Sequence, residues 1–366
     1  MAAEPTSWSE RDWTVAPGEI LLEALEDRNM SQSDLARRMG RPIKTINEIV
    51  NGKAAITPDT AIQLELSLGI SADVWNNLEA TYRSDLARAR SQRELAGFGS
   101  WASEFPVKDL ERHGLIETSG GLAGSVAALL AYFRVSTPSA WEQHWLTHGA
   151  AFRSSPAFES SPYASAAWLR WGELAAEAIE TQPFDPGRFR DALGEIRELT
   201  ARDFALVREA VQDLCASGGV AFVVTPELTG THVSGAARWL ASDKAILQVS
   251  LRHKTDDQLW FSFFHEARHL LEKRRSDFID SDARAQRDKD RAEEDADRFA
   301  RDILVAPADY EEFVRDGIFT ADAVRSFAKA QRVAPGVVVG RLQRDEHVPP
   351  NRLNNLKRRL EPGATK

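Results

Sequence analysis

The sequence is poor in cysteine and has no long apolar run. The one cysteine, Cys215, excludes an internal disulfide framework and a cysteine-based zinc site, so a metal would have to be held by histidine and carboxylate side chains. No stretch approaches the ~18 apolar residues that span a bilayer, and residues 1–8 lack the basic and apolar regions of a secretory signal. These absences predict a cytoplasmic protein that does not enter a membrane.

The composition is that of a globular protein with more than one module. The chain has 366 residues, of which 43% are hydrophobic and 28% are charged, and this length favours two or three cores over one. The net charge of −9 argues against a protein that is basic throughout. Any binding to nucleic acid would therefore depend on a local basic surface.

The pattern of apolar residues divides the chain into regions. Residues 16–83 and 84–218 are expected to be helical, and tryptophans at helical spacing in the second region suit a helix core face better than a cofactor site. The elements expected next are strands over 220–225, 237–241 and 245–250, a helix over 256–272, an exposed charged connection over 273–291 and an amphipathic helix over 290–305. This order predicts an α+β unit.

The helix expected over 256–272 contains the motif H-E-x-x-H, from His265 to His269. Residues four apart lie on one face of a helix with Cβ atoms ~5–6 Å apart, so both imidazoles can share one Zn²⁺. Glu266 follows the first histidine and can accept a proton from water and pass it to a leaving amine. The alternative is a helix that happens to carry two surface histidines. The rarity of the motif favours a catalytic zinc, one per chain.

A catalytic zinc takes three protein ligands and keeps one position open. Glu293 is the best candidate for the third ligand, because it shares a helix face with Asp297, which could then orient a ligating imidazole. Glu294 competes, but it points roughly 100° away around the helix. Taken alone, this segment would be better interpreted as an ordinary solvated acidic run. Beside H-E-x-x-H, the ligand interpretation is preferred.

Four segments together resemble the ImmA/IrrE family of metallopeptidases. They are residues 233–239 (VSGAARW), 264–271 (FHEARHLL), 293–300 (EEDADRFA) and 335–342 (PGVVVGRL). The resemblance covers roughly residues 210–345. It implies a zincin-like fold in which His265, His269 and Glu293 hold zinc and Glu266 is the general base. It also implies a regulatory peptidase, typically one that cuts a repressor in the cytoplasm. Arg268 stands where family members often have glycine.

The pattern does not identify the group that would stabilise a developing oxyanion. Four residues are candidates because they are near the motif in sequence: His232, Arg238, His253 and Tyr310. The alternative for each is an ordinary surface or structural role. A substrate peptide could add as a strand along residues 237–241.

A second motif lies near the N-terminus. Ser31 is a capping residue ahead of a helix that ends at Gly40-Arg41-Pro42, and a second short helix over 43–50 ends at Asn51-Gly52. Two helices joined by a glycine-containing turn form the helix-turn-helix pattern. The side chains expected to fix the angle between the two helices are Leu35, Ala36, Ile46 and Ile49.

The same segment carries a local surplus of positive charge. From Arg37 to Lys53 the basic residues are Arg37, Arg38, Arg41, Lys44 and Lys53, against one acidic residue, Glu48. This surplus suits contact with phosphates, with Lys44, Asn47 and Glu48 available to base edges. The alternative is a helical hairpin with a solvated basic face.

Residues 45–61 (TINEIVNGKAAITPDTA) and 73–78 (DVWNNL) resemble the HigA-type antitoxin branch of the Cro/repressor-like (XRE) helix-turn-helix proteins. The resemblance covers roughly residues 16–90. It implies five helices, an operator DNA and a homodimer that reads a two-fold site. By position, it implies that Gln32 touches the DNA backbone, that Lys44, Asn47 and Glu48 face the groove, and that Arg41 and Asn51 lie at its edges. Some family members also have a toxin partner.

The predicted fold is therefore multidomain, with an all-α helix-turn-helix domain, an α-helical middle region and an α+β zincin-like metallopeptidase domain. The boundaries expected are a tail over 1–15, the DNA-binding domain over 16–90, the middle region over 91–215, the peptidase domain over 216–345 and a tail over 346–366. The predicted function is DNA-binding regulation combined with zinc-dependent cleavage of a regulatory protein. The alternative is a repressor or antitoxin that does not cleave and uses the zincin domain as a sensor or scaffold.

Overall fold

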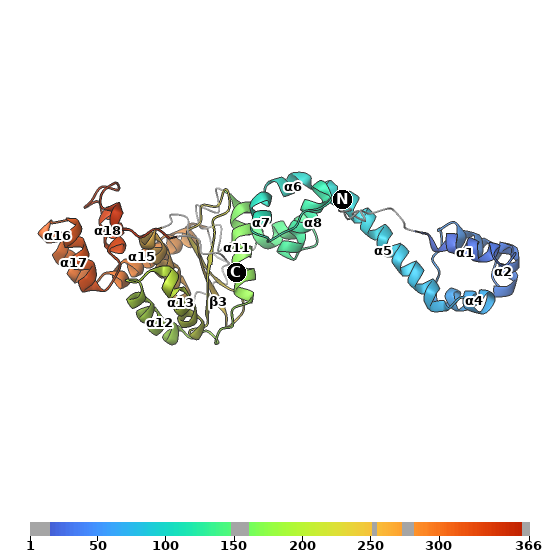
Figure 1. The fold of residues 1–366 in the computed structure, drawn as a ribbon, viewed down its shortest axis with the longest axis horizontal. Helices are drawn as coiled ribbons and strands as arrows, with labels where there is room; N and C mark the ends of the chain where they lie inside the picture. The colour runs from blue at the N-terminus through green and yellow to red at the C-terminus, as the bar shows by residue number, and fades with distance from the viewer. Residues whose placement is uncertain (1–14, 148–160, 251–254, 273–281, 361–366) are drawn as a thin grey trace, which may run out of the picture. The chain divides into compact units, whose positions relative to one another are not determined.

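The computed structural model describes residues 15–147, 161–250, 255–272 and 282–360, with the backbone alone at 147 and over 282–290. It divides into two compact units (Figure 1). The first comprises Met1–Gly99 with Leu122–Gly124, and the second comprises Ser100–Gly121 with Ser125–Lys366. Among the described residues, no helix is both long enough and apolar enough to cross a membrane.

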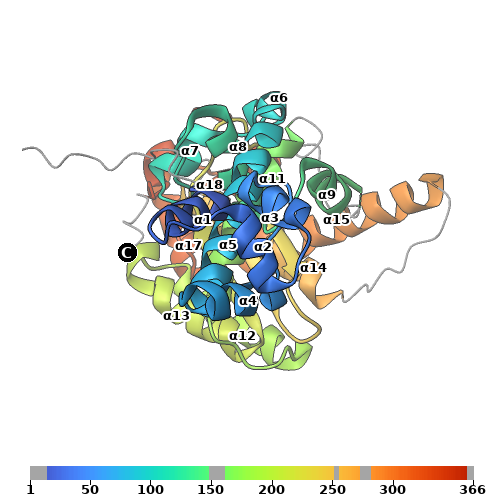
Figure 2. The ribbon, with the colours of Figure 1, turned by 90° about the vertical axis from the view of Figure 1, so that its right-hand side faces the viewer.

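The N-terminal unit is built from five helices, drawn in blue in Figures 1 and 2. They are α1 (Pro17–Glu26), α2 (Gln32–Met39), α3 (Ile43–Val50), α4 (Pro58–Leu68) and α5 (Ala72–Ala96). Their core is formed by fully buried side chains, among them Leu21, Leu35, Ile46, Leu64 and Trp75. Each helix of this unit contributes one of these side chains, so the unit has a hydrophobic core of its own.

Local chemistry sets the turn between α2 and α3. The Ser31 side chain accepts a hydrogen bond from the Asp34 amide, and Asp34 reaches back to the Ser31 amide, which forms a capping box. Gly40 ends α2 with φ of 63°, a left-handed conformation that glycine adopts without strain. Ile46 and Ile49 of α3 are buried with Leu35 and Ala36 of α2, as the sequence predicts.

The second unit begins with helices and continues into a small sheet and a further set of helices. The first helices are α6 (Gly99–Ser103), α7 (Val107–Arg112), α8 (Gly121–Phe133), α9 (Pro138–Trp141), the π-helix η1 (Glu142–Thr147), α11 (Pro162–Glu177), α12 (Pro186–Leu199) and α13 (Phe204–Ser217). The elements that follow are β1 (Val220–Thr225), β2 (Gly235–Trp239), β3 (Ala245–Ser250), α14 (Asp256–Leu271), α15 (Asp282–Leu304), α16 (Pro307–Asp316), α17 (Ala321–Gln331), α18 (Pro335–Arg344) and the 3₁₀ helix η3 (Asn354–Leu356).

The sheet has the strand order β1-β3-β2, with β1 parallel to β3 and β2 antiparallel to it. Alternate side chains face opposite sides, as the pleat requires. On one side, Phe222 and Leu247 join the large core formed with α12, α13 and α14. On the other side, Ala221 and Ile246 contact Ala176 of α11. In Figure 1 the sheet accordingly lies between α11 and the pair α12 and α13.

The middle region expected over 91–215 is not a separate domain. The helix α5 continues the N-terminal unit to Ala96, and the helices after it belong to the second unit, apart from Gly99 of α6 and Leu122–Gly124 of α8. Apolar side chains of α12 and α13, such as Leu193 and Val211, are fully buried in the core that contains β1 and β3. Because the three-stranded sheet cannot cover both of its own faces, these helices are part of the α+β unit.

Two further expectations differ from the structure. The helix α15 begins at Asp282, within the segment predicted as an exposed connection, and residues such as Ala, Arg, Gln and Lys in that segment have high helix propensity. The expected tail 346–366 is folded in its described part, because Val348, Leu356 and Leu360 are buried in the main core. A β-bridge joins Arg359 to Thr255, directly before α14. Residues 1–14 and 361–366 lie outside the described residues.

Candidate metal centre and candidate nucleic-acid interface

The helix α14 turns two histidines toward α15. Its buried side carries Phe263, Phe264 and Ala267, which pack in the core with the sheet. His265 and His269 lie one helical turn apart on another face and are only partly buried. The core contacts of α14 therefore fix the direction in which the two imidazoles point.

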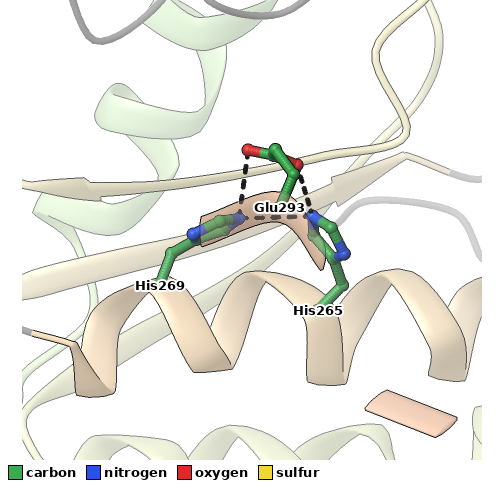
Figure 3. A group of neighbouring side chains, drawn as sticks. All are labelled: His265, His269 and Glu293. Atoms are coloured by element: carbon green, nitrogen blue, oxygen red, sulfur yellow. Dashed lines mark hydrogen bonds and ion pairs between the residues drawn. The ribbon is translucent and has the colours of Figure 1, made fainter. Parts of the chain in front are cut away.

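Glu293 of α15 faces both histidines, and Figure 3 shows the three side chains converging. The Nε2 atoms of His265 and His269 are 3.2 Å apart, and the Glu293 carboxylate oxygens lie 3.1 Å from His265 Nε2 and 3.5 Å from His269 Nε2. Tetrahedral zinc with ligand bonds of 2.0–2.1 Å requires ligand atoms about 3.3 Å apart. The spacing and the donor set of two imidazoles and a carboxylate therefore fit Zn²⁺. Glu294, the competing candidate, is exposed and outside this cluster.

Asp297 holds His265 from the side opposite Glu293. Its Oδ1 lies 2.9 Å from His265 Nδ1, and an ionised carboxylate can only accept, so Nδ1 carries a proton and Nε2 faces the cluster. The other oxygen, Oδ2, accepts a hydrogen bond of 2.5 Å from Arg344 of α18. Burial opposes ionisation of Asp297, but the hydrogen bond from His265 and the charge of Arg344 hold the pKa of Asp297 below its usual value.

The acids and bases of the cluster have clearly shifted pKa values. Burial alone would lower the pKa of His265, but hydrogen bonds to Asp297 and Glu293 raise it to about 10. Burial lowers the pKa of His269. The hydrogen bond from His265 lowers the pKa of Glu293. At neutral pH the cluster therefore contains a protonated His265, a neutral His269 and an ionised Glu293.

Glu266 points toward strand β2 instead of joining the three clustered ligand atoms. Its carboxylate accepts a hydrogen bond from the Ala237 amide, and burial raises the pKa of Glu266 to about 7. Gly235 gives it room, because a Cβ at that position would lie 2.7 Å from the Glu266 Cγ. Arg268, between the two histidines in sequence, is directed to Glu272 of its own helix.

The structure assigns other roles to two of the four oxyanion candidates. Arg238 is buried and donates hydrogen bonds to Glu173 and to the Leu169 carbonyl of α11. Tyr310 is buried with the Arg341 guanidinium 3.9 Å from its ring centroid. His232 is exposed, and His253 lies outside the described residues.

Two features of this centre could not be predicted from the sequence. Arg344 lies 47 residues after Asp297, and no local pattern links the two positions. Gly235 lies in a segment quoted only for its resemblance, and its close approach to Glu266 depends on how β2 packs against α14. Both are tertiary contacts, which spacing along one helix cannot reveal.

The residues predicted to touch DNA lie on α2, on α3 and in the turns beside them. Lys44 and Asn47 of α3 are exposed, on the side opposite the buried Ile46 and Ile49. Glu48 is 3.8 Å from Lys44, so each partly neutralises the other. The described structure thus leaves one polar face of α3 open to solvent.

The remaining predicted contacts flank that face. Gln32 is partly exposed at the start of α2, and Lys53 is exposed after α3. Asn51 donates a hydrogen bond of 2.7 Å to the Asn47 carbonyl. Arg41 differs from the others, because its guanidinium donates to Gln63 of α4 at 2.6 Å. Arg41 therefore joins the turn to α4 and is less available than a free surface arginine.

Comparison with known proteins places the N-terminal unit in a family. Residues 21–75 match the helix-turn-helix family. The uncharacterized HTH-type transcriptional regulator YddM of Escherichia coli is 40% identical over 63 residues, which cover 17% of this chain and 67% of YddM. The chain therefore belongs to the helix-turn-helix family through this unit. The match confirms the helix-turn-helix predicted from the capped helix, its glycine turn and the helix that follows.

The chain is also similar to solved structures over about a fifth of its length. An addiction module antidote protein of a HigA family from Coxiella burnetii is 34% identical and covers 22% of this chain and 90% of its own, with a TM-score of 0.22. The antitoxin HigA of Pseudomonas aeruginosa, solved with the higBA promoter, is also 34% identical and covers 22% of this chain and 89% of its own, with a TM-score of 0.22.

Proposed function

We propose that this protein is a DNA-binding transcriptional regulator whose second unit is a zinc-dependent endopeptidase that cleaves a regulatory protein. The family of the N-terminal unit supports the first part. The observation that carries the second part is the convergence of His265, His269 and Glu293, with their ligand atoms within 4.8 Å of one another. The zincin-like character of the second unit is part of the same proposal.

In the N-terminal unit, α3 is the element that enters the major groove of an operator. Lys44 and Asn47 reach base edges, and Lys53 and Gln32 contact the phosphate backbone. A homodimer would present two such helices to a two-fold site, as in other helix-turn-helix regulators. A toxin partner is compatible with this surface, because the groove-facing residues occupy only one side of the unit.

In the second unit, His265, His269 and Glu293 would hold the metal and Asp297 would keep the His265 ring in place. Bound zinc supplies a Lewis acid that polarises a peptide carbonyl and makes water a nucleophile at neutral pH. Glu266 accepts a proton from the attacking water and delivers it to the leaving amine. A pKa of about 7 suits both transfers, since the carboxyl gains and loses its proton near neutral pH.

The peptidase proposal is tested by metal analysis and by a base variant. We expect purified protein to hold one zinc per chain, and Glu266→Gln to keep the zinc while losing cleavage of a peptide library. Glu293→Ala should lose most of the zinc, whereas Glu294→Ala, which changes the exposed neighbour, should not. Cleavage that survives in Glu266→Gln would refute the assignment of the base.

The DNA-binding proposal is tested by measuring operator affinity at several salt concentrations. We expect strong salt dependence, and a loss of affinity in Lys44→Ala and Asn47→Ala. Arg93→Ala removes the same charge as Lys44→Ala near the C-terminal end of α5 and serves as the control. Equal losses in Lys44→Ala and Arg93→Ala would show that α3 is not the reading helix.

One result would select the alternative function. If wild-type protein binds both zinc and operator but cleaves no peptide, the second unit acts as a sensor or scaffold for a repressor or antitoxin. Zinc removal should then change operator affinity, which the peptidase proposal does not require.

A further inference from the structure

The two oxygens of the Asp297 carboxylate have different partners on different helices. Oδ1 accepts from His265 of α14 at 2.9 Å, and Oδ2 accepts from Arg344 of α18 at 2.5 Å. Asp297 itself stands on α15. A single chain of hydrogen bonds therefore runs from α18 through α15 to the imidazole whose Nε2 faces the cluster.

The Arg344 side chain is held on a second side. Its guanidinium lies 4.8 Å from the ring centroid of Phe261, close enough for a cation–π interaction. Phe261 stands one turn before His265 on α14, and their ring centroids are 6.1 Å apart. Arg344 thus contacts both Asp297, which orients His265, and Phe261, whose ring lies near that of His265.

The backbone beneath Arg344 is also fixed. Arg341, one turn earlier on α18, donates to the carbonyl oxygens of Arg301 and Val305 near the end of α15. These bonds set the position of α18 against α15. Arg344 therefore reaches Asp297 from a helix that has little freedom to slide.

The exposure of this ion pair argues against a role in stability. The side chain of Arg344 is 53% exposed and that of Asp297 is 30% exposed. Ion pairs this exposed contribute only about 0–1 kcal/mol to folding. The geometry favours orientation instead, because groups that hold a metal-ligating histidine strongly affect metal affinity.

We propose that Arg344 is a positioning residue of the metal centre, which fixes the Asp297 carboxylate so that His265 presents Nε2 to the ion. This inference rests on the proposed zinc site. It assigns a role to a side chain outside every motif of the sequence. It also gives Arg344 a role that Arg301 does not have. Arg301 is on α15, like Asp297, and its charge acts on Asp297, but it makes no hydrogen bond to Asp297 among the described residues.

The test compares zinc affinities of full-length variants by competition with a chelator. Asp297→Ala should weaken zinc binding by about 10–100-fold, the usual effect of losing such a partner. Because Arg344 acts one step further away, we expect Arg344→Ala to weaken it by about 3–10-fold, with Arg344→Lys in between. Arg301→Ala is the matched control, since it removes a nearby charge without removing the hydrogen bond.

A double variant shows whether Arg344 acts through Asp297. If it does, Arg344→Ala should weaken zinc binding no further in a chain that already carries Asp297→Ala. Loading with Co²⁺ adds a spectroscopic check, because Arg344→Ala should change the visible absorption of the bound ion while the thermal midpoint of the metal-free protein stays within a few degrees.

Several outcomes would overturn the inference. Wild-type affinity in Arg344→Ala, equal losses in Arg344→Ala and Arg301→Ala, or additive losses in the double variant would each remove the role of Arg344 and leave the zinc site intact. A wild-type chain that binds no zinc would overturn the proposed function, and this inference with it.

Discussion

His265 is the most constrained side chain of the candidate metal centre. Both of its ring nitrogens face carboxylates, Asp297 on one side and Glu293 on the other. These hydrogen bonds outweigh burial and raise the pKa of His265 to about 10. A metal ion can bind Nε2 only after the proton on that nitrogen has left.

The first prediction follows from that proton. At pH 7 His265 is protonated, whereas His269 is neutral because burial lowers its pKa. Zinc binding should therefore release about one proton per ion, and affinity should rise about tenfold per pH unit between pH 6 and pH 8. Calorimetry in two buffers of different ionisation enthalpy measures the proton count.

Asp297→Ala provides the control for this prediction. Without the Asp297 carboxylate the pKa of His265 should fall, so fewer protons should be released and the pH dependence should flatten. A zinc affinity that does not change over this pH range would contradict the assignment of the bound proton.

At this scale the sequence predicts the three candidate ligands, which the structure brings together, but not the residues around them. The i, i+4 spacing of His265 and His269 places them together on any helix, and the choice of Glu293 over Glu294 follows from the helical angle to Asp297. Arg344 could not be predicted, because its approach depends on how α18 packs against α15. Arg238 illustrates the converse, since its partner on α11 makes it part of a buried ion pair.

Among the elements, strand β2 has the closest relation to the site. It lies at one edge of the sheet, and its residue Ala237 donates the hydrogen bond that Glu266 accepts. At the start of β2, Gly235 leaves the space that the Glu266 side chain occupies. The position of the proposed base is thus set by a strand, while the ligands are set by two helices.

The second prediction concerns Gly235→Ala. The new Cβ would lie 2.7 Å from Glu266 Cγ, so the Glu266 side chain must move. We expect cleavage to fall by about tenfold or more, as for other small displacements of catalytic groups, while zinc affinity stays near the wild-type value. Peptide cleavage and chelator competition on the same preparation measure the two effects.

Ala236→Ser is the matched control, because it adds one atom on the opposite face of the same strand. It should leave cleavage close to wild type. A Gly235→Ala protein that cleaves at the wild-type rate would show that the Glu266 position is not critical.

The elements near the site follow closely from local patterns. The strands β1 and β3 lie where their short β-rich runs place them, and the helix α14 lies where its apolar pattern places it. The strand β2 begins two residues earlier than expected, and the cap at Ser31 marks the start of α2. The start of α15 differs from the prediction, because its run of charged residues suggests a solvated connection although the same residues favour a helix. Charge alone does not distinguish a loop from an exposed helix.

At the scale of the whole molecule, the two units have separate cores. The N-terminal core includes Leu21 and Trp75, and the second core includes the buried face of α14. The candidate zinc ligands belong entirely to the second unit. Each unit should therefore respond to its own ligand.

The third prediction is that metal removal lowers the melting temperature of the second unit alone. Zinc at about 1,000 times its dissociation constant stabilises the folded state by about 4 kcal/mol, and a chelator removes that contribution. The transition of the N-terminal unit should not move, because its core contains none of the ligands. Calorimetry of the full chain, with and without chelator, resolves the two transitions.

Restoring Zn²⁺ should return the second transition to its original midpoint, whereas Mg²⁺ should not, because imidazole ligands do not suit Mg²⁺. Operator DNA should raise only the first transition. Two transitions that shift together on chelation would show that the units are coupled.

The division into units could not be predicted as well as the motifs. The sequence predicts where a helix-turn-helix and a zinc motif begin, but it assigns residues 91–215 to a region of their own. The sequence does not indicate what the apolar faces of α12 and α13 pack against, whereas the fold shows that they cover the sheet. Such long-range pairing leaves no local periodicity.

The strand bridge between Arg359 and Thr255, together with the hydrogen bond from the Arg358 amide to Asp256, ties the start of α14 to some of the last described residues. On the ribosome, the helix-turn-helix unit has nearly all of its residues once position 99 has emerged. The contacts at the start of α14, the helix that bears His265, form only after residues about a hundred positions later have been synthesised. A nascent chain can thus complete its helix-turn-helix unit well before the second unit, which contains the proposed metal centre, is complete.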